Sequence, residues 1–419
     1  MSGPYRVLLV TDAFEPMIGG ADRAVKSVAT ELAARGHSVA VAAAWQPGLP
    51  ARETRDGIPI HRLRDLTSRI PWISADPYRH VPPPFPDPEG VVRFRRLIGR
   101  FRPDLVHSYG WLTYSCAAAL AGTGIPLVLS MHDYGNFCAL RTLLHMDREA
   151  CTGAAPLKCR RCAASHYGRA KGAVAAAGVL GGRRLLTRHA RGVQSNTGYT
   201  RSVAWRDLLA GRARFAQGSP ADAVIPPFHD RVREAEPDLA VLDRLPAGYV
   251  LFVGALRRVK GVEVLLEAHG RLADPPPLVM IGTREIDTPA GFPPGVTVLE
   301  ALPHATVMAA WDRALFGVFP SVGPEPFGIV VNEAMSRGRA VIGTAPGGHG
   351  EMIVDGETGL IVPGGDVEAL AAAMRRLIED RELRERLGAA AARRAELFEP
   401  ETWVPRVEEL YDAAVGSGR

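Results

Sequence analysis

The sequence predicts an α/β protein made of two successive domains, each with a parallel β-sheet covered by helices on both faces. Short runs of β-branched and leucine residues alternate with segments whose apolar residues recur at helical spacing, which is typical of parallel sheets. The alternation stops at Ile225-Pro226-Pro227, a polar stretch follows, and a second series begins at 249–254. The length of 419 residues leaves room for two sizeable cores.

The first domain is expected to cover residues 1–230. A helix at 21–35 is predicted because Val25, Val28 and Leu32 fall on one face. Residues 70–90 are rich in proline and predict an irregular loop. The remaining elements are predicted as strands at 6–10, 38–42, 104–107 and 126–130 and a helix at 91–101.

The second domain is expected to cover residues 248–400. Its first strand is predicted at 249–254, and two strongly periodic segments predict helices at 366–380 and 382–397. After Pro400 a last helix is predicted at 403–415, within the terminal segment 401–419.

The composition is that of an ordinary globular protein, with 47% hydrophobic and 23% charged residues. The apolar run at 5–10 is too short for a signal peptide and leads directly into a loop. The longest apolar run, 173–180, is only about half as long as a membrane helix requires. We therefore expect a cytoplasmic protein without a membrane span.

The positive charge is concentrated in the first half of the chain. Residues 1–230 carry 30 Lys and Arg against 17 Asp and Glu, whereas the rest carries 20 against 28. Residues 151–200 contain nine basic and no acidic residues. This asymmetry favours an anionic partner such as a membrane surface, nucleic acid or an acidic substrate. The alternative is a general preference for arginine, because the chain has only four lysines.

The segment from Glu325 to Glu333 carries the strongest functional signal. It follows a strand-like run at 315–321, so that the chain passes from strand to loop to helix. Ligands bind outside the carboxyl ends of the strands in open α/β sheets, and a helix start binds phosphate through its amides. Two carboxylates beside such a loop can accept hydrogen bonds from sugar hydroxyls. The amides expected to face a phosphate belong to Phe327, Gly328 and Ile329. The alternative is a surface helix start whose acidic residues favour the helix dipole.

Three further positions are candidates for the same site. Gly19 and Gly20 lie between the first strand and the first helix, where paired glycines permit close approach to a ligand. Lys260 follows the first strand of the second domain and has a compact charge suited to a diphosphate. His132 ends a predicted strand and is followed by Asp133, which can orient its ring. A simple turn and a strand-capping histidine are the structural alternatives.

Four cysteines form a separate group within 25 residues, with the spacing C-x12-C-x7-C-x2-C. Disulfides are not expected without a secretion signal. A basic loop with C-x2-C and two more cysteines is typical of structural zinc, while an iron–sulfur cluster, a redox pair and four metal-free thiols remain as alternatives. The candidate ligands are Cys138, Cys151, Cys159 and Cys162.

Together these motifs resemble family 4 of the retaining glycosyltransferases along nearly the whole chain. The E-x7-E spacing, the glycine pair before the first helix and the segment 254–261 all match the family pattern. The resemblance implies a GT-B fold, in which two Rossmann-like domains face a central cleft and the last helix crosses back to the first domain. It also implies that the first domain binds the acceptor and the second the donor. Some family members have a similar four-cysteine insertion, here 138–162.

The resemblance assigns a role to each matching residue. Glu325 is expected to contact the transferred sugar, Glu333 the ribose hydroxyls and Lys260 the diphosphate. His132 is expected to reach the transferred sugar from the acceptor side. The loop at Gly19 and Gly20 is expected to lie across from the donor phosphates. The remaining donor contacts are expected from the segment Phe327, Gly328 and Ile329. One position departs from the family pattern: Ala255 stands where the family has an arginine. Arg257 or Arg258 would have to take over the role of that arginine.

The resemblance therefore implies an enzyme, a retaining hexosyltransferase that needs no metal for catalysis. Its donor would be a UDP- or GDP-sugar and its acceptor a hydroxyl group of a lipid carrier, a glycan or a natural product. A peripheral contact with the inner membrane face is an additional hypothesis, and no nucleic-acid partner is expected. The alternatives are another GT-B enzyme, such as a sugar-nucleotide epimerase, and a non-catalytic protein that binds sugar nucleotides.

Overall fold

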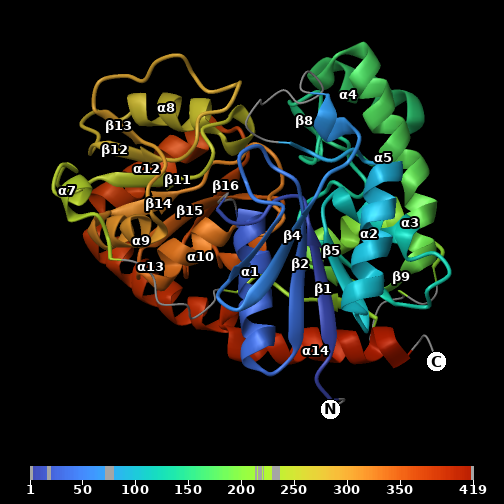
Figure 1. Ribbon diagram of the computed structural model, residues 1–419. Helices are drawn as coiled ribbons and strands as arrows, with labels where there is room; N and C mark the ends of the chain where they lie inside the picture. The colour runs from blue at the N-terminus through green and yellow to red at the C-terminus, as the bar shows by residue number, and fades with distance from the viewer. Residues whose placement is uncertain are drawn as a thin grey trace. The chain divides into compact units, whose positions relative to one another are not determined.

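The computed structural model describes residues 3–16, 20–70, 80–212, 215, 219, 221–228 and 236–416, which form two compact units (Figure 1). The first unit comprises Met1–Met146, Cys151–Asp230 and Pro400–Arg419, and the second comprises Asp147–Ala150 and Arg231–Glu399. Each unit has its own sheet and is described separately.

The first unit is built on an eight-stranded sheet in the order β10-β9-β6-β5-β1-β2-β4-β3. All neighbouring strands are parallel except β3, which is antiparallel to β4 at the edge. The strands are β1 (Arg6–Thr11), β2 (Ser38–Ala44), β3 (Arg52–Arg55), β4 (Ile58–Leu63), β5 (Leu105–Tyr109), β6 (Leu127–Met131), β9 (Ala190–Ser195) and β10 (Asp222–Val224). A separate two-stranded ladder joins β7 (Leu144–His145) to β8 (Glu149–Ala150).

Helices cover both faces of this sheet. They are α1 (Gly20–Ala34), α2 (Pro88–Phe101), α3 (Leu112–Ala119), α4 (Pro156–Tyr167), α5 (Arg169–His189), α6 (Gly198–Ala204) and α14 (Pro400–Gly416), with a 3₁₀ turn at Thr67–Arg69 and a π-helical turn at Trp205–Leu209. The helix α2 begins three residues before the predicted start because Asp87 caps it, accepting a hydrogen bond from the Gly90 amide, and Pro88 occupies its first turn.

Alternate side chains of each strand face opposite sides of the sheet. Leu8 and Val10 pack in the core under α2, α3 and α5, whereas Val7 and Leu9 pack in the core under α1 and α14. Both faces of the strands are therefore buried, which explains why the strand segments are continuously apolar in the sequence.

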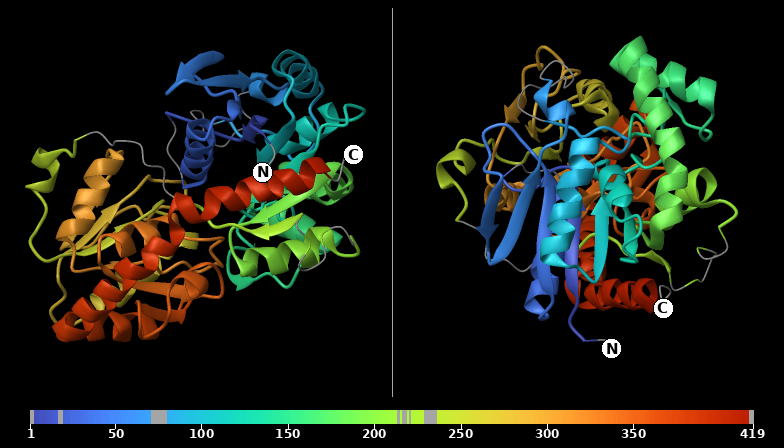
Figure 2. Two further views of the ribbon diagram at one scale, coloured as in Figure 1. Left: turned by 90° about the horizontal axis from the view of Figure 1, so that it is seen from below. Right: turned by 45° about the vertical axis from the view of Figure 1, so that its right-hand side comes forward.

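The last helix, α14, belongs to the first unit although it follows the second unit in the chain. Figure 2 shows it in red beside β9, and its side chains complete the core on the α1 face. Tyr5 Oη donates to Asp412 Oδ1 at 2.6 Å, and Arg35 pairs with Glu408 at 2.9 Å.

The second unit contains a six-stranded parallel sheet in the order β13-β12-β11-β14-β15-β16. Its strands are β11 (Val250–Val253), β12 (Leu278–Ile281), β13 (Val296–Leu299), β14 (Phe316–Val318), β15 (Ala340–Ala345) and β16 (Leu360–Pro363). The helices are α7 (Leu239–Leu242), α8 (Val262–Gly270), α9 (His304–Arg313), α10 (Ile329–Ser336), α11 (His349–Met352), α12 (Val367–Glu379) and α13 (Arg381–Ala395), with 3₁₀ turns at Arg258–Lys260 and Glu396–Phe398.

One core of this unit lies under α8 and α12 and the other under α9 and α10, with the strand residues alternating between them. In the part of the chain that the structure describes, no helix combines the length and apolarity needed to cross a membrane.

Candidate functional site

The strand order of the second unit brings two distant loops together. β11 and β14 are neighbours, and the chain continues outward from them in opposite directions, through β12 to β13 and through β15 to β16. Such a switch point leaves a crevice at the carboxyl ends of the two strands, where ligands bind in open α/β sheets. Lys260 follows β11, and Ser321 and Glu325 follow β14.

Glu325 accepts three side-chain hydrogen bonds at this switch point. Lys260 Nζ donates to both carboxylate oxygens of Glu325, at 2.8 and 2.9 Å, and Ser321 Oγ donates to Oε1 at 2.5 Å. Burial alone would raise the pKa of this carboxyl group. The charge of Lys260, the charge that His349 gains at low pH, and the hydrogen bonds from Lys260 and Ser321 outweigh burial and lower the pKa to about 2. Glu325 is therefore ionised at neutral pH, and its side chain is 12% exposed.

The glycine pair Gly347–Gly348 allows a second loop to pack directly on the Glu325 loop. The amide of Gly348 donates to the carbonyl of Glu325 at 2.6 Å. A Cβ atom on Gly348 would lie 2.4 Å from Cα of Phe327, so no larger residue fits without movement of the backbone. This contact holds the Glu325 loop against the end of β15.

Gly328 is the N-cap of α10, and the helix begins without a side-chain cap. Its φ of +122° suits glycine, and a Cβ there would lie 2.7 Å from the ring of His349. The amides of Val331 and Asn332 donate to the Gly328 carbonyl, at 2.9 and 3.2 Å, so the amides of Ile329 and Val330 are those of the first turn that a phosphate would meet. The Phe327 side chain is buried against Phe398, so only its backbone faces this position.

His349 is the buried residue behind the helix start. The Thr344 amide donates to its Nδ1 at 3.4 Å. Burial, which outweighs the attraction of Glu325, lowers the pKa of His349 to about 4. The imidazole is therefore neutral at pH 7.

Glu333 is placed differently from Glu325. It lies on α10, its side chain is 1% exposed, and Oε1 lies 2.9 Å from Nε2 of His304 at the start of α9. His304 is 23% exposed. The structure thus places the second carboxylate of the E-x7-E segment beneath a histidine.

The two arginines considered as substitutes at Ala255 each have an acidic partner. Arg257 pairs with Asp287 at 3.2 Å, and Arg258 pairs with Glu263 at 3.2 Å. Lys260 is the basic residue of this segment that contacts the Glu325 loop.

The first unit has its own switch point, between β1 and β5. Asp12 follows β1, accepts from the Leu112 amide at 2.8 Å and pairs with Arg141 at 2.9 Å. Gly110 has a φ of +79°, and a Cβ there would lie 2.3 Å from the Asp12 carboxylate. The glycine is therefore required by the position of Asp12.

Arg141 joins Asp12 to Asp133, which also accepts from the Gly135 amide at 2.8 Å. Burial opposes the guanidinium charge, but the two carboxylates outweigh it and raise the pKa of Arg141. His132 precedes this pair, with its side chain 6% exposed and Nε2 3.9 Å from Asp133. Burial is the main cause that lowers the pKa of His132.

The ring of His132 also packs on a chain of aromatic residues that ends in α14. Its centroid lies 5.4 Å from Tyr109, which lies 4.6 Å from His107. Nδ1 of His107 lies 2.8 Å from Tyr411 Oη. Burial, with a smaller contribution from His132, lowers the pKa of His107 to about 3, so the contact is made by a neutral ring.

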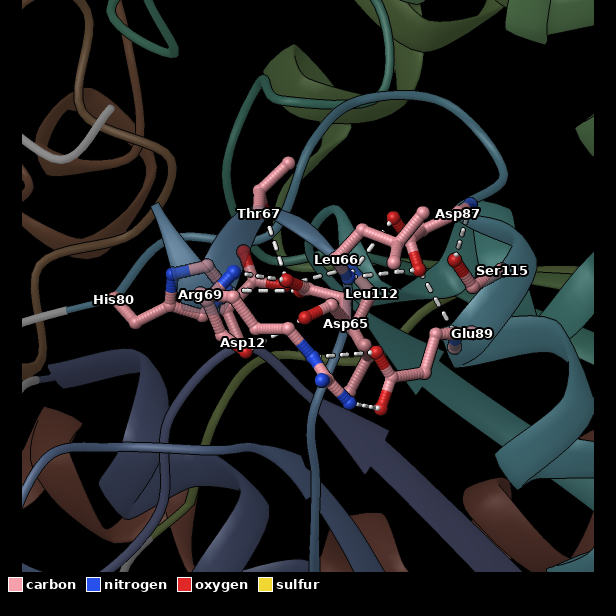
Figure 3. A network of polar contacts seen from close by, with 12 residues as sticks. Asp12, Asp65, Leu66, Thr67, Arg69, His80, Asp87, Glu89, Leu112 and Ser115 are labelled. Carbon is pink, nitrogen blue, oxygen red and sulfur yellow. Dashed lines mark hydrogen bonds and ion pairs between the residues drawn. The ribbon is translucent and has the colours of Figure 1, made fainter. Parts of the chain in front are cut away.

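A polar network holds the loops around Asp12 (Figure 3). Asp65, after β4, lies 2.8 Å from Nε2 of His80 and accepts from Thr67. Asp87 accepts from the Leu66 amide, and its own amide donates to Ser115 on α3. These bonds connect the end of β4 to the start of α2 and to α3.

Gly19, one of the predicted site residues, lies outside the described residues, and Gly20 is the first residue of α1.

The four cysteines line one cavity of about 30 Å³. All four are free thiols. Within the described ranges no three His, Cys, Asp or Glu side chains stand in a metal-coordinating arrangement. The four candidate ligands therefore line one cavity without standing in coordinating positions, and the zinc site stays a prediction.

Sequence reasoning did not identify several residues that contact the predicted ones. They are Asp12, Arg141, His304, Ser321 and His349. His349 had a local signal, because it interrupts a run of three glycines, and Asp12 had one, because it directly follows β1.

The two parallel sheets with helices on both faces, and the last helix that returns to the first unit, are those of the GT-B fold. The structure resembles sucrose-phosphate synthase from Thermosynechococcus elongatus with a TM-score of 0.71 and 21% identity, covering 98% of this chain and 100% of that one. It also resembles WaaG, a glycosyltransferase involved in lipopolysaccharide biosynthesis, with a TM-score of 0.63 and 16% identity over 98% of this chain and 100% of that one.

Sequence comparisons assign the family. Residues 18–156 match the family described as Glycosyltransferase Family 4, and residues 244–394 match Glycosyl transferases group 1. The chain is 27% identical to a glycogen synthase of Mycobacterium tuberculosis, over 98% of this chain and 95% of that protein. It is also 27% identical to a D-inositol 3-phosphate glycosyltransferase of an Arthrobacter species, over 95% and 90%. The protein belongs to family 4 of the retaining glycosyltransferases and transfers a sugar from a nucleotide-sugar donor.

Proposed function

We propose that this glycosyltransferase takes a UDP- or GDP-hexose and transfers the sugar to a hydroxyl group of a lipid carrier, a glycan or a natural product, without a metal ion in the chemistry. The observation that carries the proposal is the meeting of Lys260, Glu325 and the glycine-capped start of α10 at one switch point. A lysine and a helix N-terminus stabilise an anionic leaving group, and an ionised carboxylate accepts from sugar hydroxyls.

Lys260 can donate hydrogen bonds to the Glu325 carboxylate and to a phosphate at the same time. An ammonium group has three donors, and two of them go to the oxygens of Glu325. With 37% of the side chain exposed, the third donor is open to an incoming diphosphate. As the bond between sugar and phosphate breaks, Lys260 and the α10 amides hold the growing negative charge of the nucleotide diphosphate.

Glu325 is proposed to orient the transferred sugar, because it is ionised and fixed by Lys260 and Ser321. Glu333 is proposed to bind the ribose hydroxyls, which requires its carboxylate to exchange the contact with His304 for the donor. His132, buried and largely neutral at pH 7, is proposed to face the acceptor side of the sugar. The donor phosphate is proposed to take the acceptor proton, so no side-chain nucleophile takes part.

The first experiment is thermal unfolding of the protein against a panel of UDP-, GDP- and ADP-hexoses. UDP-glucose is tested first, because HepE from Anabaena, which has a similar fold, was solved in complex with it. A donor at 100 times its dissociation constant should add about 2.7 kcal/mol of stability. The Glu333→Ala variant should lose this effect while its unliganded stability is recorded as a control. If no donor stabilises the wild-type protein, the proposed site is wrong.

Turnover distinguishes the enzyme from its alternatives. Transfer with retention gives a product whose anomeric configuration matches the donor, read by NMR, at a rate that added Mg²⁺ or Mn²⁺ does not change. Conversion of the donor without an acceptor would identify an epimerase instead, and donor binding without any turnover would identify a non-catalytic protein.

We also propose that the acceptor is presented at the inner face of a membrane with anionic lipids. The exposed basic residues of α4 and α5 support this, since each Lys or Arg near such a surface contributes about 1 kcal/mol. These residues include Arg160, Arg161, Arg169, Arg184 and Arg188. Leu157 and Val174 on the same two helices are 70% and 54% exposed. Sedimentation with phosphatidylglycerol vesicles should fall in an Arg184→Glu/Arg188→Glu variant and persist in an Arg375→Glu control; binding that is equal with phosphatidylcholine vesicles would contradict the proposal.

A further inference from the structure

Four cysteine side chains surround one cavity in the first unit, beside the loop that follows β6. Cys138 lies in that loop, Cys151 follows β8, and Cys159 and Cys162 lie three residues apart on α4, a spacing that puts them on the same helix face. Apolar side chains of Phe137, Leu140, Leu143 and Leu144 form most of the remaining wall. The cavity of about 30 Å³ is large enough for a single ion.

Backbone amides are directed at the sulfurs. The Met146 amide donates to Cys162 Sγ at 3.2 Å. Backbone groups from Leu140 to Leu143 also hydrogen-bond to Cys138. Amide-to-sulfur hydrogen bonds stabilise thiolates over thiols, and in metal sites such outer contacts orient the ligands.

The loop between the first two cysteines adopts a backbone that its own residues disfavour. Arg141, Leu143 and Met146 have φ values of +63°, +54° and +57°. Non-glycine residues in the left-handed region persist only where the surrounding structure holds them in place. A crosslink between Cys138 and the other three sulfurs supplies such a constraint.

A Zn²⁺ ion bound by four thiolates carries a net charge of −2, and nearby basic side chains offset this charge. Lys158, Arg160 and Arg161 are neighbours of the two helix cysteines in the sequence. Positive side chains near the thiols favour their deprotonated form.

We propose that Cys138, Cys151, Cys159 and Cys162 bind one Zn²⁺ ion, and that this ion fixes the 138–146 loop so that Arg141 remains between Asp12 and Asp133. Zn²⁺ takes four thiolates in a tetrahedron, and the four thiols release four protons as they bind it. The four thiols line one cavity but have to come closer together than in this structure to coordinate the ion.

The link to function runs through Arg141, which is three residues from Cys138 and whose amide donates to the Cys138 carbonyl at 3.1 Å. Its guanidinium holds the two carboxylates at the β1–β5 switch point, next to His132. Arg141 is thus a positioning residue, and the zinc ion acts only by fixing the loop that carries Arg141. This second part rests on the proposed role of the first unit in binding the acceptor, whereas metal binding itself does not.

The first test is elemental analysis of the full-length protein purified under reducing conditions. We expect one zinc per chain, and replacement by Co²⁺ should give the intense visible bands of tetrahedral thiolate coordination. The Cys159→Ser variant should lose the metal, while Cys116→Ser, a buried thiol on α3 outside the group, should keep it. Metal-free protein, iron with a cluster absorption spectrum, or a mass showing disulfides would each overturn the proposal.

The second test separates positioning from a general loss of folding. Removing zinc, by Cys159→Ser or by a chelator, should leave donor-induced thermal stabilisation intact and lower kcat/KM for the acceptor by about 10-fold or more, the usual effect of losing an outer-shell contact. Arg141→Met should likewise lower kcat/KM for the acceptor and leave donor-induced stabilisation intact. The double variant with Cys159→Ser should have nearly the same kcat/KM as either single variant. Two independent, multiplying effects would refute the link through Arg141, even if zinc is bound.

Discussion

Replacement of Lys260 by methionine tests the central ion pair of the second unit. The variant retains most of the aliphatic side chain but leaves Glu325, 12% exposed, without its main positive partner. The fall in the pKa of Glu325 from 4.5 to about 2 corresponds to roughly 3 kcal/mol in favour of the ionised form. Because Ser321 and His349 share in this effect and Lys260 is partly exposed, we expect a loss of about 2 kcal/mol in the unfolding free energy of the second unit.

The measurement is pulse proteolysis along a urea gradient, read by mass spectrometry from peptides of residues 236–399, so that unfolding of the second unit is followed separately. In thermal unfolding the same loss should lower the melting temperature by about 4–8 °C. The double variant Lys260→Met/Glu325→Gln serves as the control, because a neutral amide needs no positive partner and should recover most of the stability.

The reasoning would be refuted if Lys260→Met alone were as stable as the wild type, or if Glu325→Gln failed to rescue it. The first result would mean that solvent already compensates the carboxylate. The second would mean that the lysine stabilises the loop through its packing and not through its charge. In either case the variant should still lose donor-induced stabilisation if Lys260 binds the diphosphate.

Three further predictions follow from the same contacts. The lowered pKa of Glu325 contributes stability that is present above pH 4.5 and is lost as the pH falls toward 2. Between pH 7 and pH 3 the unfolding free energy of Glu325→Gln should therefore fall by roughly 2 kcal/mol less than that of the wild type, measured by urea unfolding at both pH values. Gly328→Ala should destabilise the second unit by about 1–3 kcal/mol and abolish donor binding, since its Cβ meets the ring of His349 and the φ is positive; an unchanged thermal shift with donor would contradict this. Tyr411→Phe should destabilise the first unit by about 1 kcal/mol, because Nδ1 of buried His107 loses this hydrogen bond and keeps the longer contact with Tyr109 Oη at 3.3 Å; unfolding of the second unit provides the internal reference.

The strands and the E-x7-E loop could be predicted because their signals are local. The strand-like run at 315–321 contains β14, and Gly328 precedes the start of α10. Lys260 could be assigned to the same site only through the resemblance, since the order of strands that joins β11 to β14 is a property of the whole sheet.

The partners of the predicted residues could not be read from the sequence. His304 lies 29 residues before Glu333, and Asp12 lies 129 residues before Arg141, so no periodic pattern connects them. Their contacts depend on which helices and strands become neighbours. The predicted contact of Phe327 with the donor likewise has to come from its backbone, because the ring is used to fill the core.

The position of α14 has a consequence for how the protein is made. The first unit leaves the ribosome first, yet Val404, Leu410 and Tyr411 belong to its core together with Val7 and Leu9 of β1. The part of this sheet face that α14 covers therefore stays exposed until the last helix has been synthesised, whereas α1 covers its own part earlier. A fragment ending at 230 would leave the apolar surface under α14 exposed, so we expect it to be less stable than the complete first unit.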